Sequence, residues 1–186
     1  MDKIRCDWSI GNNQLYLDYH DNEWGVPEHN DQKLFELLIL EGAQAGLSWS
    51  TVLNKKENYR KAFDNFNFEK IAKYKSLKID QLLQNAGIIR NKLKVASAIS
   101  NAKVFIQIRK ECGTFDKYLW DFVNGKQINN QFETLKQIPV KTELSDKISK
   151  DLKNRGMKFV GSTIIYAYLQ AVGVVNDHQT KCFRYS

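Results

Sequence analysis

The sequence LLQNAGIIRNKLKVASAI, residues 82–99, says most about the architecture of this chain. A short helical pattern rich in leucine ends near Gly87, and a long amphipathic helical pattern begins at about Asn91. Backbone N–H groups in such a turn can bind a phosphate, with Arg90 and Lys92 beside it. A lone glycine between two helices is more often a simple C-cap, so the pattern predicts a hairpin of helices and leaves its role open.

Helical signals also dominate the rest of the sequence. Strand-like alternation is almost absent, and Pro139 falls in a connection. Candidate capping residues precede three apolar runs, namely Asn30 or Asp31, Ser48 and Thr114, and two further helices are expected to start at Ser145 and Ser162. The 186 residues suffice for one domain, or for two small lobes that share a core. We therefore expect an all-α fold with seven or more short helices.

The composition narrows the class of protein. The chain carries 28 Lys and Arg against 21 Asp and Glu, which gives a net charge of +7. A basic surface suits a polyanionic partner such as nucleic acid, although a generally basic proteome would explain the same charge. No apolar run is long enough to span a bilayer, and the N-terminus lacks the apolar segment of a signal peptide. These features predict a cytoplasmic protein without a membrane partner, and 42% apolar residues exclude a disordered chain.

Each end of the chain holds one cysteine and one histidine, and the four residues are Cys6, His20, His178 and Cys182. Thiolate and imidazole are ligands that zinc prefers, and four of them close a tetrahedral site with no position for water. Such a metal would be structural and would join the two termini. The alternative is hydrogen-bonded histidines and buried cysteines, because neither pair has zinc-finger spacing. The remaining His29 and Cys112 are expected in solvent and in the core, respectively.

Glu41 stands at an unusual position for a carboxylate. It belongs to the apolar face of a predicted helix that also carries Leu34, Leu37 and Leu38. A carboxylate there is costly unless it is paired or used in function. The alternative is a glutamate at a fraying helix end beside Gly42, facing water.

Aromatic residues gather in the polar stretch LYLDYHDNEWGVP, residues 15–27, and nearby. They are Trp8, Tyr16, Tyr19 and Trp24, and the stretch EGAQAGLSW adds Trp49. Such side chains can stack on a planar base and bind its edge. The ordinary alternative is that they fill the core of a helical protein.

Five stretches of the chain occur together in one known family. They are YHDNEWGVP (19–27), LEGAQAGLSW (40–49), AGIIRNK (86–92), RGMKFVGST (155–163) and VNDH (175–178). In this order, and over nearly the whole chain, they closely resemble DNA-3-methyladenine glycosylase I. That family belongs to the helix–hairpin–helix superfamily of base-excision glycosylases. The resemblance implies an enzyme that hydrolyses the N-glycosidic bond of 3-methyladenine in alkylated double-stranded DNA, releasing the free base and leaving an abasic site.

The resemblance also implies roles for individual residues. It implies one structural zinc ion held by Cys6, His20, His178 and Cys182. It implies a single domain over residues 1–186, with an active site between two small lobes in which Glu41 accepts a hydrogen bond from the base. The aromatic residues that would enclose the base are Tyr16, Tyr19, Trp24, Trp49 and, close by, Trp8. Gly46 and Leu47 match the wedge that fills the gap in the duplex, and the residues that would contact DNA phosphates are Gly87, Ile89, Arg90 and Lys92.

The sequence departs from related glycosylases at positions that matter for catalysis. Other branches place an Asp about one long helix beyond the hairpin, and here no Asp lies between Asp80 and Asp116. Lyase-type relatives have a catalytic Lys where this chain has Asn91, and Ile89 replaces the second hairpin glycine. We therefore expect a monofunctional enzyme that uses water and has no lyase activity. Methylation at N3 already makes the base a cationic leaving group, so Glu41 would act in recognition and electrostatics.

Two other classes of protein fit parts of the sequence. A DNA-binding module without activity would share the charge, the hairpin and the metal ligands, but it needs neither Glu41 nor the aromatic set. A zinc hydrolase needs an open coordination position, which four protein ligands do not leave. No feature requires a partner subunit, so we expect a monomer.

Overall fold

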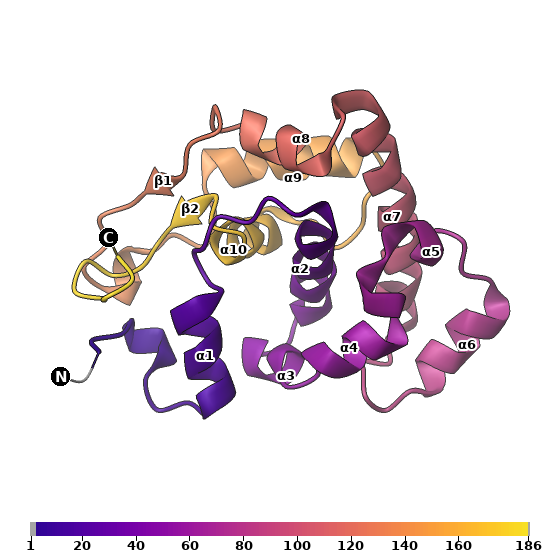
Figure 1. Ribbon diagram of the computed structural model, residues 1–186, viewed down its shortest axis with the longest axis horizontal. Helices are drawn as coiled ribbons and strands as arrows, with labels where there is room; N and C mark the ends of the chain where they lie inside the picture. The colour runs from indigo at the N-terminus through magenta and orange to yellow at the C-terminus, as the bar shows by residue number, and fades with distance from the viewer. Residues whose placement is uncertain (1–2, 186) are drawn as a thin grey trace.

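The computed structural model describes residues 3–185, and helices make up most of it (Figure 1). The ten α-helices of this described part are α1 (Gln14–Asn22), α2 (Asp31–Gln44), α3 (Trp49–Leu53), α4 (Lys56–Ala62), α5 (Phe68–Ile71), α6 (Ser76–Gln84), α7 (Lys92–Cys112), α8 (Phe115–Asp121), α9 (Glu143–Asn154) and α10 (Ser162–Ala171). The 3-10 helices are η1 (Asp7–Ser9), η2 (Asp64–Phe66) and η3 (Leu135–Gln137). The expected all-α class with seven or more short helices is confirmed.

Four of the predicted helix starts are confirmed by their caps. The side chain of Asn30 accepts hydrogen bonds from two backbone N–H groups at the start of α2, and Asn91 does the same for α7. Ser48 and Thr114 each accept one such bond, at α3 and α8. These side chains satisfy N–H groups that the first turn of a helix leaves unpaired.

One helix start differs from the prediction. The cap of α9 is Thr142, and Ser145 is the third helical residue, where its hydroxyl accepts a hydrogen bond from the Thr142 N–H at 2.9 Å. This reciprocal arrangement lets either residue resemble a cap in the sequence. Helix α10 starts at Ser162, as predicted, with Gly161 at the cap position.

Helix α2 lies at the centre of the fold, in contact with α3, α7, α8 and α10 (Figure 1). The larger cluster of buried apolar side chains includes the inner residues of α2, α7 and α10. A smaller one, here called the terminal cluster, comprises Cys6, Tyr19, Trp24, Leu53, Ala171 and Cys182. The strands β1 (Ile128–Asn129) and β2 (Val175–Asn176), which the sequence did not indicate, pair in parallel. The two ends of the chain lie on the same side of the molecule (Figure 1).

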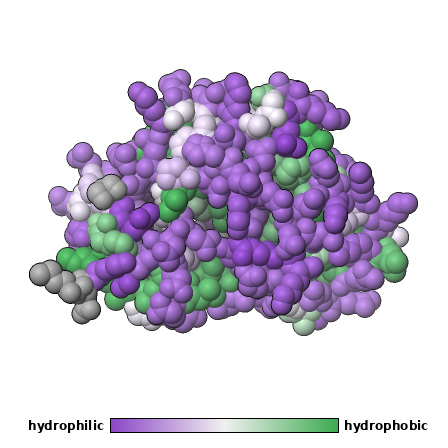
Figure 2. Space-filling model, in the orientation of Figure 1, coloured by the Kyte–Doolittle hydropathy of each residue, from purple (hydrophilic) through white to green (hydrophobic). Residues whose placement is uncertain are grey.

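The surface is mostly hydrophilic. On the face shown in Figure 2, the largest hydrophobic areas lie at the lower left, in the region of α1 and α3. No helix between residues 3 and 185 combines the length and the apolar character needed to cross a membrane. In the same region, aromatic side chains of α1 and α3 line a cavity that is described below.

Gly173 provides a test of the packing between α10 and the chain after α1. Its φ is +69°, and a Cβ atom added there would lie closer than 3.0 Å to the backbone of Val26 and Pro27. Gly173→Ala is therefore expected to lower the free energy of unfolding by about 3 kcal/mol or more, because positive-φ strain and overpacking act together. Urea unfolding followed by circular dichroism measures the loss.

Gly125→Ala is the matched control. Gly125 has a φ of +70° but no atom within 4 Å of an added Cβ. The control should lose only about 1–2 kcal/mol from strain alone. Equal losses in the two variants would contradict the close approach of the Val26 backbone to Gly173.

Candidate active site

A cavity of about 300 Å³ lies between the terminal cluster and helices α2 and α10. Its lining residues come from both halves of the chain and are Trp8, Tyr16, Tyr19, Trp24, Glu41, Gln44, Trp49, Leu135, Ile138, Ala167 and Gln170. The structure therefore brings together Glu41 and all five aromatic residues that the sequence suggested. The volume and the flat walls suit a small planar ligand.

Glu41 is almost completely buried on this wall. The residue is 4% exposed, and α2 continues past it to Gln44, so the alternative of a fraying helix end in water is wrong. No hydrogen bond or ion pair reaches its carboxyl group from residues 3–185. Burial therefore raises the pKa of Glu41 from 4.5 to about 8.

Glu36 shows what a buried glutamate on the same helix does when it is paired. It is also 4% exposed. Its carboxylate accepts hydrogen bonds from Arg60 Nε at 2.8 Å and from Lys33 Nζ at 3.3 Å. Ion pairs of this kind balance the burial of Glu36 within the protein, whereas the acid of Glu41 stays available to a ligand.

The aromatic residues pack into two walls. The Trp8 ring lies edge-on to Tyr16 and Trp24, with centroid separations of 5.4 and 4.9 Å. Tyr19 and Trp49 lie 5.2 Å apart. The Nε1 atoms of Trp8 and Trp49 are buried without an acceptor in the described part of the chain. The walls offer flat aromatic surfaces, which suits a planar heterocycle.

A second cavity, of about 350 Å³, adjoins the first and shares Glu41, Gln44 and Ala167 with it. Gly46 and Leu47, which follow α2, line it together with residues from the first turns of α10. Leu47 is 42% exposed. An apolar side chain thus stands in solvent directly beside the cavity that holds Glu41.

The hairpin between α6 and α7 uses some of its own backbone N–H groups. The N–H of Gly87 donates to Asn85 Oδ1 at 2.8 Å, and that of Ile89 donates to a tyrosine hydroxyl at 3.2 Å. The N–H groups of Arg90 and Lys92 have no acceptor within residues 3–185. The backbone groups open to a ligand are therefore those of Arg90 and Lys92 rather than those of Gly87 and Ile89.

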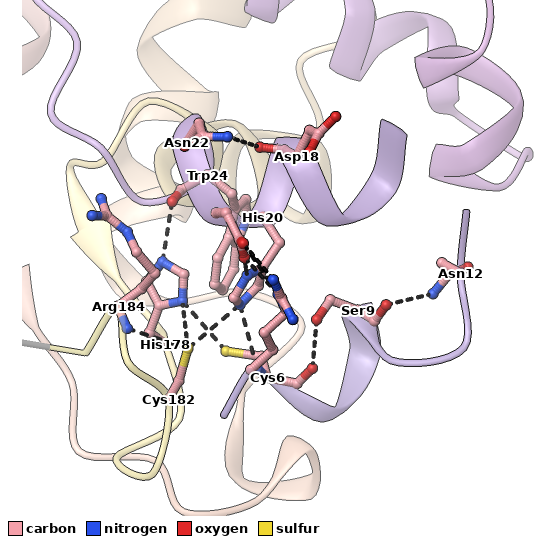
Figure 3. A network of polar contacts seen from close by, with 12 residues as sticks. Cys6, Ser9, Asn12, Asp18, His20, Asn22, Trp24, His178, Cys182 and Arg184 are labelled. Atoms are coloured by element: carbon pink, nitrogen blue, oxygen red, sulfur yellow. Dashed lines mark hydrogen bonds and ion pairs between the residues drawn. The ribbon is translucent and has the colours of Figure 1, made fainter. Parts of the chain in front are cut away.

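Cys6, His20, His178 and Cys182 converge on one buried point, with all four ligand atoms within 4.8 Å of one another (Figure 3). The Cys6 sulfur is 3.4 Å from His178 Nδ1. The Cys182 sulfur is 3.5 Å from His20 Nε2 and 3.6 Å from His178 Nδ1. A tetrahedral zinc with Zn–S of about 2.3 Å and Zn–N of about 2.0 Å separates sulfur and nitrogen by about 3.5 Å. The four residues therefore fit a metal ion with four protein ligands.

The other ring nitrogens of the two histidines are also held. His20 Nδ1 lies 2.8 Å from Asp21 Oδ1, and His178 Nε2 lies 3.1 Å from the Trp24 carbonyl oxygen. Hydrogen bonds from Arg5 and His20 lower the pKa of Asp21 to about 2, so it is an anion. An N–H directed at a carboxylate or a carbonyl leaves the opposite nitrogen as the metal ligand. This orientation is a second observation that fits a metal site.

The Cys/His cluster directly supports the aromatic cavity. The ring of Trp24 packs on His178 with centroids 4.6 Å apart, and the ring of Trp8 packs on His20 at 5.2 Å. Figure 3 shows Trp24 beside the two imidazoles. The position of two cavity walls therefore depends on the cluster.

Several residues fall outside the cluster or were missed from the sequence. His29 is exposed, as expected, and Cys112 is partly buried against the core, away from the cluster. The cavity residues that the sequence did not suggest are Gln44, Leu135, Ile138, Ala167 and Gln170. Gln44 lies one helical turn after Glu41, and that spacing could have identified it. The others come from distant segments and carry no local signal.

Comparison with known proteins places the chain in a family. A family model described as methyladenine glycosylase matches residues 8–185. The DNA-3-methyladenine glycosylase of Haemophilus influenzae is 49% identical over 179 residues, which cover 96% of each chain. A crystal structure of 3-methyladenine DNA glycosylase I matches with a TM-score of 0.95 at 48% identity and covers 98% of this chain and 100% of that one. The Staphylococcus aureus enzyme, studied for its recognition of 3-methyladenine, matches with a TM-score of 0.93 at 36% identity, over 96% of this chain and 95% of that one.

The helical fold, with a buried acid in an aromatic cavity, is that of a protein whose site suits a planar ligand. The chain belongs to the methyladenine glycosylase family. The resemblance to DNA-3-methyladenine glycosylase I is thereby confirmed, and the protein is a glycosylase, an enzyme that hydrolyses N-glycosidic bonds.

The raised pKa of Glu41 predicts a specific dependence of stability on pH. The native state keeps this proton up to about pH 8, whereas the unfolded state releases it near pH 4.5. The stabilising contribution of the protonated Glu41 is therefore fully present below pH 4.5 and is lost as the pH rises through 8. Relative to Glu41→Gln, the wild type should lose up to about 5 kcal/mol of unfolding free energy over this range. Urea unfolding at several pH values measures the difference.

Glu36→Gln is the control for this prediction. It removes the charged partner of Arg60 and should lower stability at neutral pH by about 2 kcal/mol. Parallel pH profiles for the wild type and Glu41→Gln would show that Glu41 does not titrate as described.

Proposed function

We propose that this protein hydrolyses the N-glycosidic bond of 3-methyladenine in alkylated double-stranded DNA. The products are the free base and an abasic site. The observation that carries this proposal is the unpaired, buried Glu41 between aromatic walls. Adenine methylated at N3 is a cation, so it can supply the positive partner that Glu41 lacks among residues 3–185. The aromatic rings suit the planar faces of the base.

The role of Glu41 lies in recognition and electrostatics. When a cationic base enters, the carboxylate form of Glu41 becomes favourable, and the attraction offsets part of the cost of extruding the nucleotide. A neutral adenine offers no such gain. Because methylation already makes the base a good leaving group, orientation and a water molecule suffice for the remaining chemistry.

The enzyme is proposed to be monofunctional. No lysine is among the residues that line the cavity within the described chain, and Asn91, at the position of the lyase nucleophile in relatives, caps α7 with its side chain. The amide of Asn91 is thereby engaged in holding the helix start. This arrangement supports hydrolysis by water without cleavage of the DNA strand.

The proposed contacts with DNA lie around the two cavities. Leu47, exposed beside Gly46, would fill the gap left in the duplex, since inserted apolar side chains serve this purpose. In the helix–hairpin–helix, Arg90 and Lys92 would bind a phosphate through backbone N–H groups and charge, while Gly87 and Ile89 shape the turn. The two apolar clusters support a division of the domain into two lobes, with the base pocket between them.

One structural zinc ion is proposed at Cys6, His20, His178 and Cys182. The donor set, the sulfur–nitrogen distances and the orientation of both imidazoles support this choice of metal. When bound, the ion supplies a covalent tie between the two chain ends. Four protein donors leave no position for a substrate, which speaks against the alternative of a zinc hydrolase. Membership of a glycosylase family speaks against a DNA-binding module without activity.

Release of bases from methylated duplex DNA tests the reaction. The wild type should release 3-methyladenine, detected by mass spectrometry, and leave the strand uncut in a denaturing gel. Glu41→Gln should lower kcat/KM by about 100-fold or more, because the electrostatic partner of the base is lost. Glu36→Gln, corrected for its folded fraction, should retain activity. Wild-type turnover by Glu41→Gln would refute the role of Glu41, and a cut strand would refute the monofunctional assignment.

Metal content tests the structural site. The purified protein should hold about one zinc ion per chain, and Cys182→Ser should lose it together with thermal stability. Cys112→Ser is the matched control, since Cys112 lies outside the cluster and should leave the zinc content unchanged. Mass spectrometry of the metal and thermal unfolding measure both effects. Zinc removal that abolished activity in a protein of unchanged fold and stability would favour a catalytic metal instead.

A further inference from the structure

Asp177 is a second buried carboxylate near the cavity, and the reaction as described gives it no role. The residue is 0% exposed. One carboxylate oxygen accepts hydrogen bonds from the Tyr166 hydroxyl at 2.6 Å and from Gln170 Nε2 at 2.7 Å. The other accepts one from Asn130 Nδ2 at 2.6 Å. Three neutral donors thus hold this carboxylate in place.

The three donors come from two parts of the fold that pack around Asp177. Tyr166 and Gln170 lie one turn apart on α10, and Asn130 follows β1, which pairs with the strand immediately before Asp177. Burial, followed by the bond to Asp177, raises the pKa of Tyr166, so its hydroxyl keeps its proton and donates. The position of the carboxylate is therefore well determined.

Asp177 fixes the orientation of the Gln170 side chain. A carboxylate only accepts hydrogen bonds, so the NH₂ group of the amide must face it and the oxygen Oε1 must face elsewhere. Gln170 lines the same cavity as Glu41. Its Oε1 receives no hydrogen bond from residues 3–185. The acceptors of this cavity that have no donor within residues 3–185 include the Glu41 carboxyl group, the Gln44 amide oxygen and Gln170 Oε1, and only that of Gln170 is oriented by a hydrogen bond of its own amide.

We infer that Gln170 is a specificity-determining residue that accepts a hydrogen bond from the exocyclic amino group of the bound purine, and that Asp177 is the residue that positions it. This inference rests on the proposed function. An adenine carries an amino group at the position where a guanine carries a carbonyl oxygen. The fixed acceptor Gln170 Oε1 favours the amino group, whereas a carbonyl oxygen would leave it facing another acceptor.

The link to Asp177 strengthens this preference. An amide that donates to an anion is polarised, and its oxygen becomes a better acceptor. Because the amide cannot turn over without placing its oxygen against the carboxylate, Gln170 cannot present a donor to a guanine-type base. The pair thus provides discrimination that Glu41 alone, which can hold or release a proton, does not provide.

Gln127 offers a matched control for the side chain. Its partly buried side-chain amide also donates hydrogen bonds, to the carbonyl oxygens of Gly25 at 2.9 Å and Gly173 at 2.7 Å. Gln127 does not line the cavity. The backbone carbonyl of Gln170 accepts the Gly25 N–H at 3.0 Å, and this bond survives a change of side chain. Gln127→Leu therefore tests loss of structural bonds, and Gln170→Leu tests loss of the acceptor.

The experiment measures kcat/KM for release of 3-methyladenine and of 3-methylguanine from the same methylated duplex. The proteins are the wild type, Gln170→Leu, Asp177→Asn and Gln127→Leu, each with its unfolding curve. Gln170→Leu should lower release of 3-methyladenine about ten- to hundredfold, the range for a hydrogen bond to a charged partner, and should lower the ratio of the two rates. Asp177→Asn should lower the ratio by a smaller factor, because its amide lets Gln170 turn over.

The outcomes separate this inference from the proposed function. An unchanged ratio in Gln170→Leu, or a change no larger than that in Gln127→Leu, overturns the inference. Absence of base release by the wild type and by Gln127→Leu overturns the proposed function itself. Gln170→Leu decides the question even when Asp177→Asn fails to fold.

Discussion

The free-energy cost of burying the Glu41 carboxyl without a partner is the constraint around which this site is organised. The rest of α2 supplies the apolar burial that offsets it, since every residue from Leu34 to Ala43 is buried. Lys94, at the start of α7, donates to the carbonyl oxygens of Ala43 and Ala45 and so holds the end of α2 in place. The acid is thereby fixed at the cavity without being neutralised by a charge of the protein.

The terminal cluster supplies the opposite side of the same cavity. Segments that begin and end the chain meet there, and Trp8 and Trp24 pack on the imidazoles of His20 and His178. A metal that joined these residues would hold the aromatic walls at a fixed distance from Glu41. The Cys/His cluster and the cavity are therefore adjacent, and a loss of rigidity in the cluster would widen the cavity.

Local features of the sequence were predictable because their causes are local. The caps at Asn30 and Asn91, and the inward direction of Glu41, follow from side-chain chemistry and helical spacing. The start of α9 was missed because Thr142 and Ser145 cap each other reciprocally. The link between Asp177 and Gln170 depends on how α10 packs against the β1–β2 pair, and no spacing within the sequence encodes that contact.

The contrast between Glu36 and Glu41 explains how one helix can carry both a structural and a recognising acid. The Glu36 carboxylate is already paired with Arg60 within the protein, so it is not available to a ligand. With a pKa of about 8, Glu41 holds its proton in the free protein at neutral pH and does not repel DNA phosphates. A cationic base reverses this balance and a neutral base does not. Under the proposed function, the full charge at the site appears only with the lesion, and burial without a partner is what makes that response strong.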